Sequence, residues 1–249
     1  MQKRIDWMRL PVLFLASIVL VLLGGCNSQS TSSGASATNA PVEAQMQVQP
    51  EFVSLFDGKT LNGWIQIPEN SWTVKDGAIA SLGVGRGMIY TTDDYSFYRL
   101  IFTARHITVP KHDHQECFLI FCTRPTPGQK PLDALGGVQF QIPNGGHWDY
   151  RKGHNNGGKG EFTTLPHPKF DPTKWFQVEI LVNAATGKAR MAVAQPVGSK
   201  AVEVLDFDVP AAGKTGPFAF QMHNKGLFDE YKDVMIEVNP TYDGLITTK

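Results

Sequence analysis

The chain has 249 residues, of which 42% are hydrophobic and 18% are charged, and its 23 basic and 23 acidic side chains give a formal net charge of zero. Zero net charge argues against a nucleic-acid partner and against electrostatic attraction to a membrane surface, because both of these partners are anionic. Any association with a membrane must therefore come from a separate segment of the chain.

The first 25 residues have the organisation of a signal peptide. Lys3 and Arg4 open a basic region, and a largely apolar run then extends from Leu10 to Leu23. The run spans roughly 14 residues, whereas a helix that crosses a bilayer needs about 20. It ends at Leu23-Gly24-Gly25-Cys26, which resembles the bacterial lipobox, a motif whose cysteine is acylated before the signal is cleaved. We therefore expect a lipid on Cys26 rather than a permanent transmembrane anchor.

The predicted lipid is the membrane link, and it places the protein in the cell envelope. Asn27 follows the cysteine where an Asp would commonly signal retention in the inner membrane, so we expect the outer membrane or the periplasm. Residues 26–50 are rich in Ser, Thr, Ala, Gln and Asn and cannot bury enough apolar surface to fold, which predicts a disordered tether. We expect one β-sandwich domain over 51–240 and a C-terminal tail over 241–249.

Period-two patterns of apolar residues recur after Pro50, and no later stretch shows a sustained helical repeat. The clearest strand runs from Trp175 to Asn183, where apolar residues alternate with Gln177 and Glu179. A turn at 184–187 leads to a strand near 189–193, which predicts a hairpin. Further strands are expected near 52–56, 72–82, 87–91, 97–107, 116–124, 135–142, 201–209, 217–223 and 233–239. The class is therefore all-β, as a two-sheet antiparallel sandwich of the jelly-roll type.

Three of the expected strands carry polar side chains at alternating positions. These side chains, two from each strand, belong to Glu116, Arg124, Gln139, Gln141, Gln221 and His223. If the three strands are neighbours in one sheet, their polar groups form a surface suited to binding sugar hydroxyls. The alternative is an ordinary sheet surface that faces solvent.

A long polar segment over 143–174 is expected to be a loop, and loops of this length in a compact domain are usually functional or disordered. The rings of Trp148 and Tyr150 favour packing on the domain or stacking on a ligand. His147 and Asp149 are candidates for a general base and for the carboxylate that orients it. The alternative is that His147 only stabilises the loop.

A second polar cluster contains His112, His114 and Glu116. The His-x-His spacing on an extended chain places both imidazoles on one side, as a metal site requires. Without a distant third ligand we expect a solvated turn and no cofactor, and a divalent metal is the alternative.

A family resemblance is carried by three segments, which are FVSLFDGKTLNGW at 52–64, WTVKDG at 72–77 and WFQVEI at 175–180. Together they resemble the 3-keto-disaccharide hydrolase family, whose opening motif is specific, and the resemblance extends over nearly the whole domain. It implies a concanavalin A-like jelly roll, a carbohydrate partner and an exported lipoprotein of a glycan-degrading bacterium.

The resemblance also implies an activity on glycosides whose sugar is first oxidised to a ketone at C3. The glycosidic bond is then cleaved by hydrolysis, and one route is elimination followed by hydration. This route needs a base, a group that stabilises the enolate oxygen and an acid. The candidate base is His147 or His223, the enolate partner is Arg124 or Arg86, and the acid is Glu116. Candidates for binding the substrate are Arg86, Gln139, Gln141, Trp148, Asp149 and Gln221.

Two positions depart from the family pattern. Gln139 stands where the family commonly has a carboxylate, and Gln115-Glu116-Cys117 replaces the usual Asn-Ser-Gly. The alternative function is therefore a non-catalytic carbohydrate-binding lipoprotein of the envelope. A third interpretation is a domain that docks a partner protein there.

Overall fold

The computed structural model describes residues 50–107, 117–120, 124–133, 136–141, 148–154, 171–208 and 215–249. Within these ranges the chain forms strands and turns, and no helix is long and apolar enough to cross a membrane. The strands of this part of the chain, in order, are β1 (Val53–Ser54), β2 (Trp64–Ile67), β3 (Trp72–Lys75), β4 (Ala78–Ser81), β5 (Gly87–Thr91), β6 (Phe97–His106), β7 (Cys117–Ile120), β8 (Gly136–Gln141), β9 (Trp148–His154), β10 (Phe176–Asn183), β11 (Lys188–Ala194), β12 (Val202–Asp208), β13 (Ala219–Met222) and β14 (Asp229–Val238).

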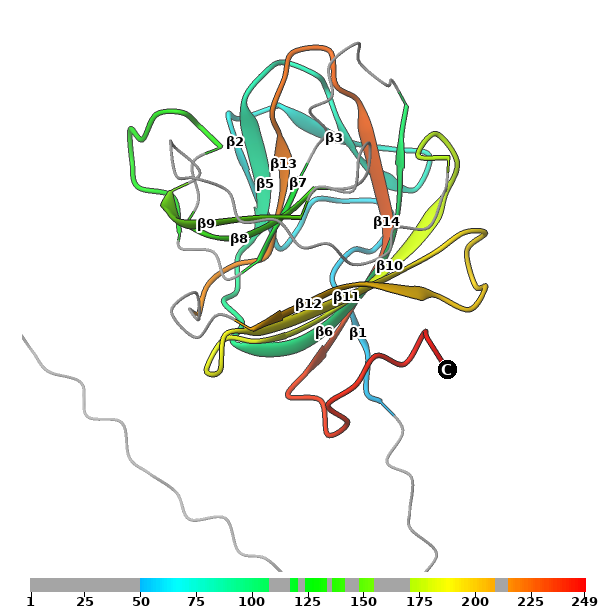
Figure 1. The fold of residues 1–249 in the computed structure, drawn as a ribbon. Coiled ribbons are helices and arrows are strands. Elements are labelled where there is room, and N and C mark those ends of the chain that lie inside the picture. Colours follow the sequence, from blue (N-terminus) through cyan, green and yellow to red (C-terminus); the bar gives the residue numbers. More distant parts are fainter. Residues whose placement is uncertain are drawn as a thin grey trace, which may run out of the picture. The chain divides into compact units, whose positions relative to one another are not determined.

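These strands form two antiparallel sheets (Figure 1). The eight-stranded sheet has the order β12-β11-β10-β6-β14-β4-β3, with β1 paired to β14. The six-stranded sheet has the order β2-β5-β13-β7-β8-β9. The predicted all-β sandwich of two antiparallel sheets, jelly-roll or concanavalin A-like, is confirmed.

The core lies between the two sheets and follows from the alternation of apolar residues. In β10 the side chains of Phe176, Val178, Ile180 and Val182 are buried in the core, as the sequence pattern predicts. Aromatic rings from both sheets meet there, and the rings of Phe220 in β13 and Tyr231 in β14 stack with centroids 3.8 Å apart. Packing of this kind fixes the two sheets against each other and sets the face on which each polar residue lies.

Two expected elements differ from the structure. The stretch 72–82 is a hairpin of β3 and β4 rather than one strand, because Asp76 and Gly77 adopt φ values of 50° and 75° and reverse the chain. The segment over 143–174 was expected to lack regular structure, but β9 lies within it and pairs with β8. In β9 the aromatic residues Trp148 and Tyr150 alternate with polar ones, which is a strand pattern that the surrounding glycines obscure.

The outer face of the eight-stranded sheet binds the C-terminal segment through buried charges. Arg99 of β6 has a fully buried side chain and pairs with Glu179 of β10 at 2.9 Å. Arg99 also donates to the carboxylate of Glu237 and, at 2.8 Å each, to the backbone carbonyl oxygens of Tyr242 and Gly244. One guanidinium therefore links three separate parts of the chain.

Glu179 also binds the C-terminal segment directly. Its carboxylate accepts hydrogen bonds from the backbone N–H groups of Ile246 and Thr247, at 2.9 and 2.8 Å. Leu245 is buried beside Leu181. Glu179 lies on the face opposite to the core residues, as predicted, but the segment predicted as a tail covers it.

Candidate functional site

The outer face of the six-stranded sheet carries the candidate site. In β13, Phe220 belongs to the core, and the alternation places Ala219 and Gln221 on the other face. Gln221 pairs with Met88 of β5, and Ala219 pairs with Tyr90. Met88, Tyr90 and Ala219 form a small apolar cluster on this outer face, which we call the floor.

The three strands predicted to present polar side chains are neighbours in this sheet, in the order β13-β7-β8. Ala219 pairs with Leu119 of β7, and Leu119 pairs with Gln139 of β8. Gln141 pairs with Cys117. The register positions of Gln139 and Gln141 therefore fall in line with the floor rather than with the core.

Four polar side chains meet at one end of the floor, and we call them the Asp133 cluster: Arg86, Asp133, Gln221 and His223. The guanidinium of Arg86 lies 3.4 Å from Oδ1 of Asp133, and Gln221 donates to Oδ2 of Asp133 at 2.8 Å. Nη2 of Arg86 is 3.0 Å from Nε2 of His223. Three candidates from the sequence, Arg86, Gln221 and His223, are thus brought together.

Burial is the largest influence on the pKa of Asp133 in this cluster. Asp133 and Gln221 are fully buried, whereas the Arg86 side chain is 44% exposed. Burial raises the pKa of the Asp133 carboxyl, and the charge of Arg86 and the hydrogen bond from Gln221 act in the opposite direction. A buried carboxylate with a raised pKa, paired with an arginine that in turn contacts a histidine, is typical of a functional site.

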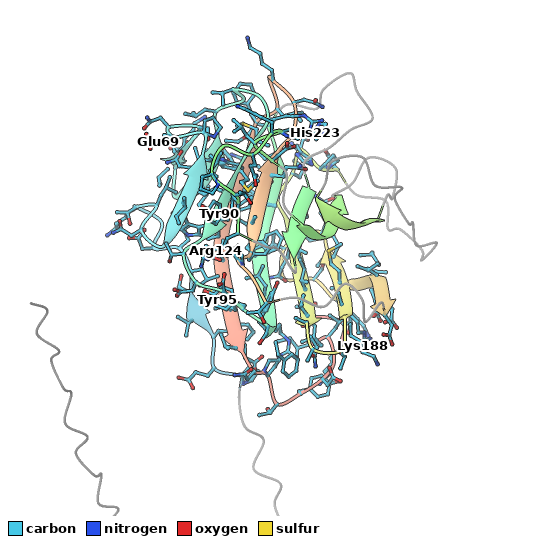
Figure 2. The ribbon with its side chains drawn as sticks, turned by 90° about the vertical axis from the view of Figure 1, so that its left-hand side faces the viewer. Glu69, Tyr90, Tyr95, Arg124, Lys188 and His223 are labelled. Carbon is cyan, nitrogen blue, oxygen red and sulfur yellow. The ribbon has the colours of Figure 1, made fainter. Side chains whose placement is uncertain are left out.

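Arg124 lies at the other end of the floor, beside Tyr90 (Figure 2). Its guanidinium is 3.0 Å from the carboxylate of Asp94 and donates to the carbonyl oxygen of Thr92. Burial raises the pKa of the Tyr90 hydroxyl, while the nearby charge of Arg124 lowers it. Arg124 therefore stands apart from Arg86 and His223, which lie near the opposite end of β5.

Two of the remaining predicted residues, Trp148 and Asp149, lie in β9, an edge strand of this sheet. Asp149 of β9 pairs with Gln139, and Trp148 pairs with Phe140, so both residues belong to a strand and not to a loop. Trp148 pairs with Phe140, which pairs with Phe118, which pairs with the core residue Phe220. Its register position is therefore in line with the core rather than with the floor. Glu116 and His147 lie outside the described residues, as do His112 and His114.

Asp133 is the residue that sequence reasoning missed. It lies in a connection between β7 and β8, in the stretch Lys130-Pro131-Leu132-Asp133, where no periodicity marks it. Only the long-range contacts with Arg86 and Gln221 give it a role. Among the residues that the structure describes, no group of three or more His, Cys, Asp or Glu side chains could hold a metal ion.

Comparison with solved structures identifies similar folds. A candidate glycosyl hydrolase from Parabacteroides distasonis superposes with a TM-score of 0.54 at 16% sequence identity, covering 76% of this chain and 94% of that one. A second such structure from the same organism has a TM-score of 0.51 at 16% identity and covers 76% and 99%. At these identities the likeness shows a common fold.

Comparison at the level of sequence gives the family. No curated protein matches the chain at a significant level. The profile of the 3-keto-alpha-glucoside-1,2-lyase-like domain matches residues 51–237, which confirms the resemblance seen in the motifs and supports a glycan-related function. The chain belongs to the family of 3-keto-alpha-glucoside-1,2-lyase-like domains.

Proposed function

We propose that the domain cleaves the glycosidic bond of glycosides and disaccharides whose sugar carries a ketone at C3. The observation that carries the proposal is the contact between His223 and Arg86, whose Nε2 and Nη2 atoms are 3.0 Å apart. In a 3-keto sugar the acidic C–H bond at C2 and the carbonyl oxygen at C3 are on adjacent carbons. A base and an oxyanion donor that act on this substrate must therefore be neighbours.

The proposed reaction is an elimination followed by hydration. His223 takes the proton from C2, and the electron pair of that C–H bond forms the C2–C3 double bond of an enolate, whose oxygen accepts hydrogen bonds from Arg86. The carbonyl then re-forms as a C1–C2 double bond appears and the C1–O bond breaks, and an acid protonates the departing oxygen. Addition of water across C1–C2 yields the free 3-keto sugar.

The geometry favours particular candidates for these roles. Arg86 is the better enolate partner, because it contacts His223, whereas Arg124 is paired with Asp94 at the far end of the floor. Glu116 is the proposed acid and His147 the alternative base, on the grounds of residue type and of position along the predicted strands. The apolar floor between the two arginines suits the faces of a sugar ring, since ligand sites combine apolar surface with a few fixed polar groups.

A non-catalytic carbohydrate-binding protein is the second candidate function. It is favoured by Gln139, an amide where the family commonly has a carboxylate, and by the ion pairs that already occupy both Arg86 and Arg124. In this case oxidised and unoxidised sugars bind to the floor without being cleaved.

We further propose that the protein is held in the cell envelope by a lipid on Cys26, with the outer membrane as its site. The support is the motif Leu23-Gly24-Gly25-Cys26 at the end of an apolar run, and Asn27 after it. An envelope location suits an enzyme that acts on glycans before the products are taken up.

The test is incubation with a panel of 3-keto glycosides and their unoxidised counterparts in D₂O, with aglycone release and deuterium at C2 as the readouts. Elimination followed by hydration places solvent deuterium at C2 of the product, whereas direct hydrolysis leaves the original hydrogen there. A control without protein corrects for spontaneous exchange. Release from the 3-keto compounds alone, with deuterium at C2, supports the proposal. Binding without release supports the second candidate, and equal release from unoxidised glycosides contradicts both.

A further inference from the structure

The contact between Arg86 and His223 fixes the position of the proton on the imidazole. A guanidinium has five N–H donors and no acceptor, so Nε2 of His223 must accept the hydrogen bond from Nη2 of Arg86. A ring that accepts at Nε2 is neutral and carries its proton on Nδ1. Nδ1 lies 3.0 Å from Oδ1 of Asn224, which is placed to accept that proton's hydrogen bond.

The position of Arg86 depends in turn on Asp133. An arginine whose side chain is 44% exposed has many rotamers available, and side-chain entropy opposes any single one of them. Asp133 is fully buried and is itself held by the amide of Gln221 at 2.8 Å. It therefore offers Arg86 a fixed carboxylate at the end of the floor.

Stability alone gives little reason to retain this carboxylate. Burial raises the pKa of the Asp133 carboxyl, so its charged form is held at a cost in free energy. Replacing a whole buried ion pair with well-packed neutral residues is often neutral or stabilising, and the Arg86 side chain, 44% exposed, stays in contact with water without this partner. Positioning of Arg86 is a role that a neutral residue at this site would not fill.

We propose that Asp133 is a positioning residue that acts through Arg86 to hold His223 in the Nδ1–H form, with the Nε2 lone pair capped by the guanidinium. The inference rests on the proposed function, in which that lone pair is the base. When a 3-keto sugar binds, the Nη2–H group of Arg86 turns from Nε2 to the carbonyl oxygen at C3. The same movement polarises the substrate and uncovers the base beside the C2 proton.

Nitrogen-15 NMR of the histidine rings tests this in the protein without any substrate, because long-range ¹H–¹⁵N spectra distinguish the Nδ1–H form from the Nε2–H form. A His223→Asn variant assigns the signals. We expect the Nδ1–H form in the native protein and a shift to a mixture rich in Nε2–H in Arg86→Met. Asp133→Asn is expected to shift the ring in the same direction, because Arg86 loses its charged anchor.

Glu203→Gln is the matched control, because it removes the carboxylate partner of Arg190 on the other sheet and is expected to leave the His223 signals unchanged. Asp133→Ala replaces Asp133→Asn if the latter does not fold. Persistence of the Nδ1–H form in both the Arg86 and the Asp133 variants overturns the inference. A shift in Arg86→Met alone shows that Arg86 caps the ring without help from Asp133, which also overturns it.

Activity supplies an independent readout. If the proposed function holds, Asp133→Asn lowers kcat by up to about 100-fold, the scale for a reacting group misplaced by about 1 Å, and KM changes less. If no 3-keto glycoside is cleaved, the NMR result still decides the role of Asp133. The failure of the proposed function and the failure of this inference are thus separate outcomes.

Discussion

Arg86 and His223 are 137 positions apart in the sequence, and their side chains meet because Gly87 and Met222 are the last paired residues of β5 and β13. Each of the two residues is the next one beyond that pair, on neighbouring antiparallel strands. The contact is therefore set by the register of the sheet. A shift of one residue in that register would turn every side chain to the opposite face.

Alanine in place of His223 is expected to lower turnover of a 3-keto glycoside by about 10²-fold or more, the usual scale for a lost general base. The melting temperature should change little, because the ring lies at the end of a strand. His147→Ala gives the same result if His147 is the base instead. A fall in melting temperature that matches the fall in activity would indicate a structural histidine. A stable and fully active double variant removes both residues from the mechanism.

Gly87→Ala is expected to damage the site through the backbone. A Cβ at this position would lie 2.3 Å from the carbonyl oxygen of Ile67 and 2.8 Å from Cδ of Pro68, so β5 must move away from β2 and carry Arg86 with it. We expect a lower melting temperature together with loss of the Nδ1–H signal of His223. Gly77→Ala, at a turn with open space around the Cβ, is the control. Its φ of 75° makes Ala strained there, so it should cost about 1–2 kcal/mol of stability while leaving the His223 signals unchanged.

Asp133→Asn is expected to make the protein more stable and less active. Burial raises the pKa of the Asp133 carboxyl in the folded protein, so folding favours its protonated form, and stability falls as the pH rises from the ordinary carboxyl pKa of about 4 through the raised value. The variant has no such loss. Its melting temperature should therefore exceed that of the native protein at neutral pH, and the difference should vanish below about pH 4. An equal difference at all pH values would contradict the argument.

Arg99→Met is expected to destabilise the domain by about 3–5 kcal/mol, the scale for removing one partner of a buried ion pair. The change removes the guanidinium that the buried carboxylates of Glu179 and Glu237 share, and it leaves the carbonyl oxygens of Tyr242 and Gly244 without that donor. Arg190→Met is the control, because Arg190 and Glu203 are about one-third exposed, and an exposed pair contributes about 1 kcal/mol or less. Denaturant unfolding measures both. Equal losses of stability in the two variants would show that burial of the Arg99 ion pairs does not increase the loss.

Cys26→Ser is expected to release the protein from the membrane fraction without a change in the melting temperature of the domain. The reason is that the predicted acylation site lies outside the sequence that matches the family, which begins at residue 51. Fractionation on a sucrose gradient then locates the native protein. Continued sedimentation of the variant with membranes would contradict lipid anchoring, and native protein found only in the inner membrane would contradict the sorting prediction.

The sequence predicts the elements of this fold better than it predicts the site. Alternation alone identified β10, because the apolar residues from Phe176 to Val182 repeat with a period of two. It also predicted the strand of Gln221 and the strand of Gln139 and Gln141, but the structure was needed to show that both belong to one sheet, with β7 between them. It missed β9, since glycines on both sides hide a short alternating stretch. It also could not find Asp133, because an isolated carboxylate outside the strands acquires its role only from contacts made in three dimensions.

Buried charges on the outer face of the eight-stranded sheet escaped prediction for a related reason. Glu179 stands at a position that alternation assigns to the outer face, and only the C-terminal segment makes that position an interior one. A pattern within one strand reports on that strand's own two faces. It carries no information about a distant segment that later covers one of them.

The place of β14 in the eight-stranded sheet bears on the order in which the protein can fold. β14 lies between β6 and β4, so a growing chain that has not passed residue 228 leaves both neighbours with unpaired edges. Such a chain lacks the partner that joins the two halves of the sheet, and non-local pairing of this kind forms late. The polypeptide therefore cannot complete its larger sheet until the end of its synthesis, and the proposed export would then meet a chain that has not yet closed its sandwich.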